Sequence, residues 1–348
     1  MPNIVDVALK ARVSIATVSR VVNKSLHKVN RVTRERVQEA IKELDYRPNA
    51  LAKGLLMKKT MTIGIIIPDI SNPYYAEIVR GIQDVADREG YAVTLHNTDG
   101  RQEGIIRYIY LLREKSADGI IFSGGIINGQ ETLSILKELR EKVVVIGRHD
   151  VDFPAVMVDN TGGIIQAVQH LIDIGHRRIG FIGGPDGSTT ALDRLTGYRN
   201  AMGNSRLTLA SRLEKKGTWK PESGYLLGMQ LLKAKGRPTA IVAANDQMAF
   251  GAIKAAKELG LMVPEDLAVV GFDNIPLSSY FNPSLTTVEI PMHDLGAAAM
   301  GMLLNLISGE PFEKFKMFKT ALLVRGSTVR PWKEEGIEKS IDKVPLRN

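Results

Sequence analysis

From Thr62 onward, apolar runs recur about every 25 residues, and most are followed by a stretch whose apolar side chains have helical spacing. The runs stand in TIGIIIPD, YAVTLHNTD, DGIIFSG, VVVIG, VMVDN, RIGFIGG, TAIVAAND and LAVVGFD. Helices are expected at 74–89, 103–114, 161–174, 192–202 and 247–259. Because apolar strands that alternate with helices form parallel sheets with covered faces, the pattern predicts two α/β units. They span roughly 61–159 and 160–289.

Polar side chains follow several of these predicted strands. In folds of this kind, ligands bind beyond the carboxyl ends of the strands. The residues that fall at such ends are Asp69, Asp99, Arg148, Asn245 and Asp273. We therefore expect a small-molecule site to include some of them.

The positive charge of the chain is concentrated at its start. The formal net charge is +8, and residues 1–60 carry 13 Lys or Arg against 5 Asp or Glu. The remaining residues carry 33 of each sign. Such a local excess indicates an N-terminal module that binds a polyanion, because phosphate neutralisation requires clustered cations.

The first 46 residues have the pattern of three short helices. The first has apolar residues from Ile4 to Ala11 at helical spacing, and Ser14 is a suitable N-cap for a second helix that starts at Ile15. A third helix is expected after Thr33, with Val32 and Val37 as a hydrophobic staple. Its buried stripe would comprise Val37, Ala40, Ile41 and Leu44. Three helices with a tight first turn predict a helix-turn-helix unit.

Residues 49–57 could form one more short helix, which would be marginal alone in water and is a candidate hinge. The helix expected at 292–307 is rich in small residues and Met, so it is either a core helix or one that packs on a second subunit. The charged tail 332–348 is expected to be disordered or peripheral.

Several protein classes are disfavoured by the composition. The chain has no cysteine, which excludes disulfides and thiol nucleophiles, and its six histidines lack metal-ligand spacing. His176 is interpreted as structural. No common hydrolase, zinc-protease or nucleotide-binding motif occurs, so we expect no catalytic residues, no metal and no cofactor. Without a signal core or a membrane-length apolar run, a cytoplasmic location is expected.

Six segments together resemble the LacI/GalR family of bacterial transcription regulators, over essentially residues 3–331. They are VDVALKARVSIATVSRVVN, ELDYRPNALAKGLL, IIPDISNPYYAEIVRGI, HLIDIGHRRIGFIGGP, AANDQMAFGAIKAAKELGLMVPEDLAVVGFDN and PSLTTVEIP. The resemblance implies a homodimer that binds a pseudo-palindromic double-stranded operator. It also implies a two-lobed core like that of periplasmic sugar-binding proteins, with three crossovers and a small effector in the cleft.

The implied domains follow from this resemblance. Residues 1–46 would be the DNA-binding domain, 47–60 the hinge helix and linker, 61–331 the core and 332–348 the tail. Within the core, the N-lobe would comprise about 61–159 and 290–318. The C-lobe would comprise about 160–289 and 319–331.

The resemblance assigns DNA contacts to the helix-turn-helix unit and the hinge. Ile15 and Ala16 would occupy the specificity positions, Arg20 would contact a base, and Thr17 and Ser19 would contact phosphate. Leu55 would wedge into the minor groove of the operator. The full set of implied DNA-binding residues is Ser14, Ile15, Ala16, Thr17, Ser19, Arg20, Asn23, Tyr46, Asn49, Ala52 and Leu55. The stretch 23–33 is one residue longer than the usual family spacing.

The implied effector-binding residues are Tyr74, Tyr75, Arg148, Arg194, Trp219, Asn245 and Asp273. Carboxylate, amide and guanidinium groups suit carbohydrate hydroxyls, and an aromatic ring suits the apolar face of a sugar. Asn245 and Asp273 could instead cap helices, and Trp219 could fill a lobe. Leu192 stands where many sugar-responsive members carry a second Arg, and Gly147 stands where Asp is common.

A sugar or sugar phosphate is the predicted effector, and the predicted function is repression of a carbohydrate-utilisation operon. A purine or nucleoside is the next alternative, because Trp219 would stack on either class. A further alternative is a catabolite-control regulator that docks a phosphorylated carrier protein, although His293, Ala298 and Gly301 do not match the docking helix of that subgroup. A sugar-binding receptor without a DNA role would share only the core.

Overall fold

The computed structural model describes residues 2–22, 29–46, 59–124, 130–139, 142–149 and 152–329. The chain separates into two compact units. The first contains the N-terminal region up to Thr62 together with Ser116–Asp118, and the second begins at Ile63.

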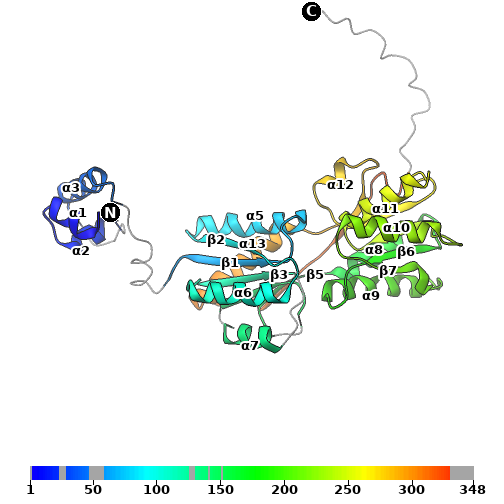
Figure 1. Ribbon diagram of the computed structural model, residues 1–348, viewed down its shortest axis with the longest axis horizontal. Helices are drawn as coiled ribbons and strands as arrows, with labels where there is room; N and C mark the ends of the chain where they lie inside the picture. The colour runs from blue at the N-terminus through cyan, green and yellow to red at the C-terminus, as the bar shows by residue number, and fades with distance from the viewer. Residues whose placement is uncertain are drawn as a thin grey trace, which may run out of the picture. The chain divides into compact units, whose positions relative to one another are not determined.

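The described residues of the N-terminal unit form three helices (Figure 1). They are α1 (Ile4–Lys10), α2 (Ile15–Val22) and α3 (Arg31–Glu43). Asn3 caps α1 by accepting the N–H of Val5 at 2.7 Å, and the side chain of Asp6 accepts the N–H of Asn3 at 2.7 Å. Arg12 has a φ of 51°, a left-handed conformation that makes the turn between α1 and α2 tight.

As predicted, α2 begins at Ile15 and is capped by Ser14, whose Oγ accepts the N–H of Thr17 at 3.2 Å. Small apolar residues from all three helices form the core of the unit. They are Val7, Ala8, Ala11, Val18, Val21, Val37 and Ala40. The predicted helix-turn-helix is therefore present.

The predicted start of the third helix is wrong. Helix α3 begins at Arg31, because Asn30 is the N-cap and its Oδ1 accepts the N–H of Thr33 at 2.7 Å. The proposed staple is also wrong, since Val32 is 67% exposed while Val37 is fully buried. Asn is as good an N-cap as any residue, and its position sets the helix start two residues before Thr33.

The N-lobe of the second unit is built on a six-stranded sheet with the order β11-β5-β4-β3-β1-β2. The strands are β1 (Thr62–Ile67), β2 (Ala92–Asn97), β3 (Gly119–Ser123), β4 (Val143–Ile146), β5 (Ala155–Val158) and β11 (Phe315–Phe318). The helices are α5 (Pro73–Arg88), α6 (Gln102–Glu114), α7 (Gln130–Glu138) and α13 (Met292–Ser308). Helix α13 packs on α5 and on β3, β4 and β5, while α6 contacts α7.

The C-lobe is built on a second six-stranded sheet with the order β12-β10-β9-β8-β6-β7. The strands are β6 (Ile179–Gly183), β7 (Glu214–Lys216), β8 (Ala240–Ala243), β9 (Ala268–Asp273), β10 (Thr286–Glu289) and β12 (Ala321–Leu323). The helices are α8 (Asn160–Asp173), α9 (Thr189–Asn204), α10 (Pro221–Lys233), α11 (Asp246–Glu258) and α12 (Leu277–Tyr280), with a short 3₁₀ turn at Ser211–Leu213. Only the pairing of β10 with β12 is antiparallel among the pairs whose register is known.

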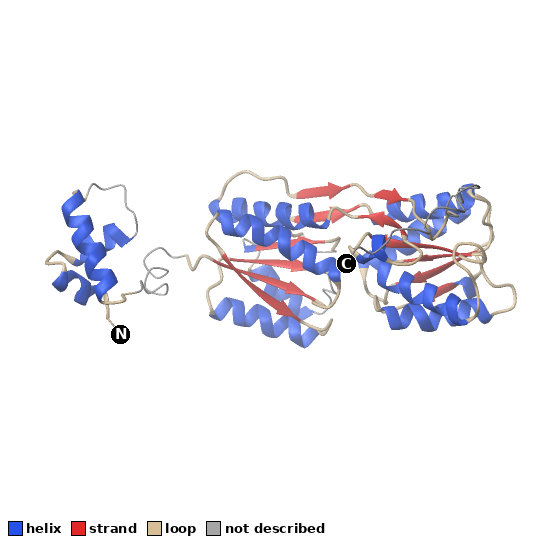
Figure 2. Cartoon of the chain, turned by 90° about the horizontal axis from the view of Figure 1, so that it is seen from above, coloured by secondary structure: helices blue, strands red, loops and turns tan. Residues whose placement is uncertain are grey.

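The chain passes between the lobes three times. The crossovers join β5 to α8, β10 to α13 and β11 to β12, and the two lobes lie end to end in Figure 2. Val158 pairs with Phe318 just before two of these crossovers, and Glu289 pairs with Ala321 beside the third. The predicted fold class, a helix-turn-helix unit and a two-lobed core of parallel sheets, is confirmed. Of the described helices, none is long and apolar enough to span a membrane.

Candidate functional site

The outer surface of α2 presents most of the predicted DNA-binding residues that the structure describes. Val18 and Val21 are buried in the unit, so the opposite face of α2 is solvent-exposed. Ser14, Ile15, Ala16 and Arg20 are exposed on it. The N-terminal part of a recognition helix is the part that reaches base edges. Ser14, Ile15 and Ala16 stand there, whereas Arg20 lies in the last turn of α2.

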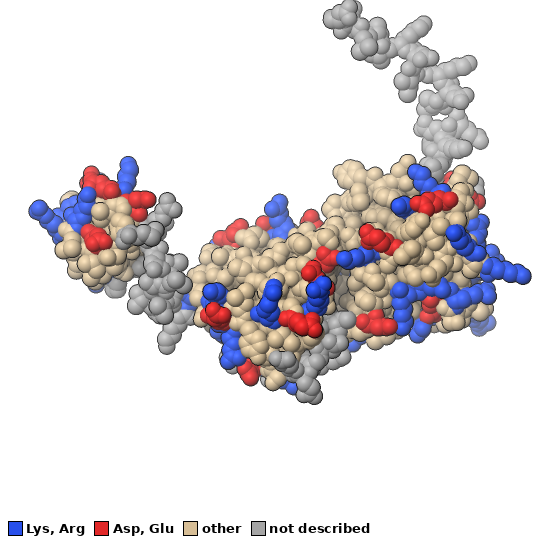
Figure 3. Space-filling model, in the orientation of Figure 1, with Lys and Arg blue, Asp and Glu red and all other residues tan. Residues whose placement is uncertain are grey.

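The hydroxyl groups of this helix are partly engaged within the unit. Ser14 Oγ lies 3.0 Å from Thr17 Oγ1, and Thr17 and Ser19 are half-buried. Tyr46 packs against the helical core. The other predicted DNA-binding residues, Asn23, Asn49, Ala52 and Leu55, lie outside the described residues. Figure 3 shows Lys and Arg side chains on the surface of this unit, beside some acidic ones.

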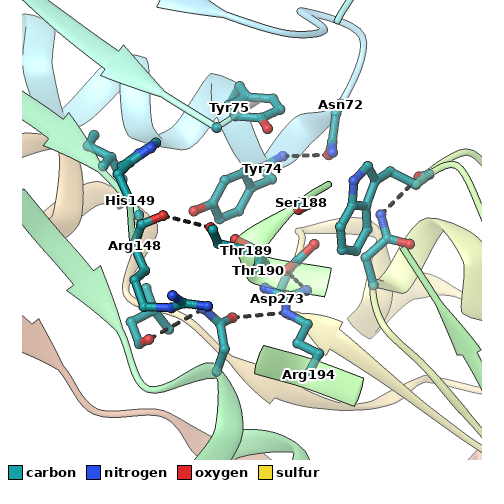
Figure 4. A pocket seen from close by; sticks show the side chains of 17 residues that line it. Asn72, Tyr74, Tyr75, Arg148, His149, Ser188, Thr189, Thr190, Arg194 and Asp273 are labelled. Carbon is teal, nitrogen blue, oxygen red and sulfur yellow. Dashed lines mark hydrogen bonds and ion pairs between the residues drawn. The ribbon is translucent and has the colours of Figure 1, made fainter. Parts of the chain in front are cut away.

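The seven predicted effector-binding residues all line one cavity between the two lobes (Figure 4). The cavity has a volume of about 80 Å³, which corresponds to on the order of six water molecules. The residues that line it beyond the predicted seven include Asn72, Gly124, His149, Asn160, Ser188, Thr189 and Thr190. Its size and polar lining suit a small molecule with many hydrogen-bonding groups.

Arg194, on α9, is the buried centre of this cavity and is only 4% exposed. Its Nε donates to Asn160 Oδ1 at 2.9 Å, and its Nη1 donates to Asp273 Oδ1 at 3.2 Å and to the carbonyl of Ala244. The guanidinium also lies 3.8 Å from the centre of the Phe272 ring. Its Nη2 makes no hydrogen bond within the described chain, so two N–H donors are available to a ligand.

Asp273, at the end of β9, is in direct contact with Arg194 in the cavity wall. Its φ of 113° is a strained conformation for a residue other than glycine, and such strain is typical of ligand sites. Burial raises the pKa of Asp273 to about 7, although Arg194 acts in the opposite direction. Its Oδ2 accepts no hydrogen bond from the described residues. The Arg194 and Asp273 pair therefore offers a ligand both donors and an acceptor.

The strained turn after Asp273 is held by Asp246, a second buried carboxylate. Asp246 accepts hydrogen bonds from the N–H of Ile275 at 2.9 Å, from Ser278 Oγ at 2.6 Å and from Thr287 Oγ1 at 2.5 Å. Burial raises the pKa of Asp246 to about 6. Because these donors lie on the segment after β9 and on β10, Asp246 fixes the backbone that positions Asp273.

Trp219 and Asn245 form one wall of the cavity and hold each other in place. Asn245 caps α11, because its Oδ1 accepts the N–H of Met248 at 2.9 Å, and its Nδ2 donates to the carbonyl of Trp219 at 2.9 Å. Trp219 has a φ of 68°. Its indole covers Gly184, where a Cβ atom would lie 2.2 Å from the ring. Asn245 thus has the capping role that the sequence left open, and it also orients the aromatic wall.

The opposite wall comes from the N-terminal end of α5. Asn72 caps this helix by accepting the N–H of Tyr74 at 3.1 Å. The rings of Tyr74 and Tyr75 pack edge to face with centroids 5.0 Å apart. The Tyr75 hydroxyl lies where a Cβ at Gly124 would be, and Gly124 also has a φ of 69°. Burial raises the pKa of both tyrosines, which therefore stay neutral.

Arg148 follows β4 and links the N-lobe to α9 of the C-lobe. Its side chain pairs with Asp193 at 2.9 Å, and its backbone carbonyl accepts a hydrogen bond from Thr189 Oγ1 at 2.6 Å. Helix α9 begins at Thr189 with Ser188 as its N-cap, so the predicted start near residue 192 is too late. Because of this error, the hydroxyl groups of residues 188–190 were not predicted to be part of the site, although serine at position 188 is a typical N-cap signal.

A second pocket, of about 550 Å³, adjoins this corner of the C-lobe. It shares Arg148, Ser188 and Thr189 with the inter-lobe cavity and continues between α9 and β7. A ligand with more than one ring has space to extend over Thr189 in this direction.

A helix-turn-helix unit joined to a two-lobed core with a small-molecule cavity defines a class of DNA-binding regulators under effector control. The family model for bacterial regulatory proteins of the lacI family matches residues 3–49, and that for a periplasmic binding protein-like domain matches residues 168–328. The chain therefore belongs to the lacI family of transcription regulators, as the relatives below show.

Proteins similar to this chain match its sequence along nearly its whole length. Catabolite control protein A of Priestia megaterium is 41% identical over 310 residues, which are 88% of this chain and 93% of that protein. The ribose operon repressor of Halalkalibacterium halodurans is 37% identical over 330 residues, 94% of this chain and 97% of that protein. A lac repressor dimer bound to operator and an anti-inducer superposes with a TM-score of 0.85 at 31% identity, covering 94% of this chain and 99% of that one.

Proposed function

We propose that this regulator is a repressor that acts as a homodimer on a pseudo-palindromic operator and is controlled by a sugar or sugar derivative in the inter-lobe cavity. Residues on the exposed face of α2 would contact the DNA, with Arg20 at a base and Ile15 and Ala16 at the specificity positions. The chain would have no catalytic role and need no cofactor, since effector binding alone would switch its affinity for DNA.

The Arg194 and Asp273 pair is the observation that carries the assignment of a sugar. A hydroxyl group both donates and accepts, so adjacent hydroxyls on a ring can satisfy Nη2 of Arg194 and Oδ2 of Asp273 together. The half-buried indole of Trp219 supplies an apolar surface beside them. This combination of a few convergent polar groups and an aromatic wall is typical of carbohydrate recognition.

The cavity supports a two-state coupling between effector and DNA. Arg148 and Thr189 already join the lobes across it, and a ligand bound there contacts both lobes. A change in lobe closure would alter how the two subunits hold their DNA-binding units. Linkage requires that effector and operator change each other's affinity by the same factor, typically 5- to 150-fold.

Calorimetry with a panel of monosaccharides, disaccharides, sugar phosphates and purines tests this proposal. We expect saturable binding of at least one sugar, lost in Arg194→Ala, and a different affinity when operator DNA is present. The sign of that difference distinguishes an inducer from a corepressor. Binding only of purines would replace the sugar assignment with the nucleoside alternative. A steep decline of DNA affinity with salt tests the DNA-binding role separately.

Similarity to catabolite control protein A favours one second candidate, control by a phosphorylated carrier protein docked near α13. On that helix, His293 Nε2 lies 2.9 Å from Asp84 Oδ2, so its exposed imidazole is already paired with a carboxylate. Binding of such a carrier to the full chain, abolished by a substitution on α13 but not by Arg194→Ala, would support this alternative.

A further inference from the structure

The side chain of Arg148 is occupied by a carboxylate of its own chain. Its Nε lies 3.2 and 3.1 Å from the two carboxylate oxygens of Asp193, and its Nη2 lies 2.9 Å from Oδ1. This is a fork-shaped, charge-assisted arrangement, the same one in which arginine binds a phosphate or carboxylate ligand. The negative charge of Asp193 therefore lies against a guanidinium group that lines the cavity.

The second arginine of the cavity, Arg194, is likewise paired with a carboxylate of its own chain. Arg194 pairs with Asp273, and both side chains are 5% exposed. Each of the two guanidinium groups that line the cavity thus has its own carboxylate. A ligand that carries a phosphate or carboxylate would therefore meet a carboxyl group beside each arginine.

The corner around Arg148 would otherwise favour an anion. The first turn of α9 carries Ser188, Thr189 and Thr190 on the cavity wall, and the N-terminal end of a helix favours negative charge. Figure 4 shows these residues beside Arg148. Thr189 ties this turn to the Arg148 carbonyl, so the donors and the cation are held together. The carboxylate of Asp193 places a negative charge in this corner.

We propose that Asp193 is a specificity-determining residue, an internal anion that occupies Arg148 and restricts the effector to uncharged polyhydroxy compounds. The proposal rests on the assignment of the cavity as the effector site. A sugar phosphate at Arg148 would bring a second negative group to a cation that is already paired with Asp193, and the repulsion between the two anions disfavours its binding. A neutral sugar leaves the ion pair intact and binds to Arg194 and Asp273.

The test is binding of inorganic phosphate to the full-length protein, measured by calorimetry and by thermal unfolding against sodium chloride at equal ionic strength. Asp193→Asn keeps the size of the side chain and removes the negative charge of Asp193 from beside Arg148. We expect it to bind phosphate at least about tenfold more tightly than the unaltered protein. The double variant Arg148→Gln, Asp193→Asn should lose this gain. Glu138→Gln, which removes an exposed carboxylate that is paired with Arg113 and lines neither pocket, is the matched control and should not change phosphate binding.

Equal phosphate affinity in the unaltered protein and Asp193→Asn would overturn the proposal, as would a gain that persists in the double variant. Asp193→Ser gives a second test with a smaller side chain if the asparagine variant is poorly folded. The sugar panel is independent of this result. Absence of any sugar binding would contradict the proposed function, whereas absence of the phosphate gain contradicts only the role of Asp193.

Discussion

The carboxylate of Asp118 accepts a hydrogen bond from the backbone N–H of Thr60 at 2.8 Å, and its other oxygen accepts the N–H of Met61 at 2.9 Å. Thr60 Oγ1 also donates to the carbonyl of Ser116 at 2.9 Å. Asp118 is 7% exposed. The turn before β3 thus holds the residues through which the N-terminal region enters β1.

Replacement of Asp118 by Ala should loosen this attachment. Two backbone donors lose their acceptor, which costs about 1–3 kcal/mol where they stay shielded from water. We expect faster amide hydrogen exchange at Thr60 and Met61 and a smaller effect of the effector on operator affinity. Glu103→Ala, which removes an exposed carboxylate from the neighbouring α6, is the control. Unchanged exchange at both amides would contradict the role assigned to Asp118.

Arg20→Ala should weaken binding to the cognate operator by about 1–3 kcal/mol and flatten the preference at one base pair. The reason is that an arginine that contacts a guanine edge discriminates between bases, whereas a phosphate contact does not. Competition binding with single-base operator variants measures the effect. Arg31→Ala removes the same charge from α3, where Arg31 pairs with Glu35, and serves as the control. An equal loss on all sequences would show that Arg20 contacts only phosphate.

Arg194→Leu should lower the free energy of unfolding by about 3–5 kcal/mol at pH 8, because Asp273 would remain buried without its cation. The loss should be smaller at pH 5. Arg194 lowers the pKa of Asp273, so its removal raises that pKa further and the carboxyl is protonated and neutral at pH 5. Urea unfolding at both pH values checks this. The double variant Arg194→Leu, Asp273→Leu should be less destabilised at pH 8 than Arg194→Leu, and a loss independent of pH would contradict the argument.

The buried carboxyl of Asp246 should make the protein less stable as the pH rises from about 4 to about 6. Burial raises its pKa in the folded state to about 6, whereas the ordinary pKa of an aspartate is 3.8. In this window the folded state binds the proton and the unfolded state does not, so rising pH favours unfolding. Asp246→Asn should flatten this part of the urea-derived stability profile. Parallel profiles for the two proteins would show that Asp246 does not titrate as described.

Local signals in the sequence predicted most elements near their observed bounds. Ser14 was a correct cap for α2, because an N-cap acts through bonds to residues two or three positions away. The same rule applied to Thr33 failed, since Asn30 was the competing cap and formed the bond instead. The helix α10 was not predicted although it has 13 residues, because its apolar periodicity is weak. The strand β7 was not predicted because it has only three residues.

The seven cavity residues were predicted by resemblance, while strand ends alone indicated Arg148, Asn245 and Asp273. Asp69 and Asp99 also follow strands, yet they are absent from the cavity wall. Asn160 and residues 188–190 line it and were missed. Whether these residues lie on the cavity wall depends on where α8 and α9 begin. Capping hydrogen bonds decide those starts to within one or two residues.

The sequence by itself determined the alternation of strands and helices, the basic N-terminal unit and the buried face of α2, because apolar periodicity and charge act over short stretches of chain. Only the tertiary structure decided that Asp193 pairs with Arg148, 45 residues away in the other lobe, and that Asp273 adopts a positive φ beside Arg194. Such pairings depend on how two separately folded sheets are brought together by three crossovers. No local pattern encodes the distance between side chains on different lobes.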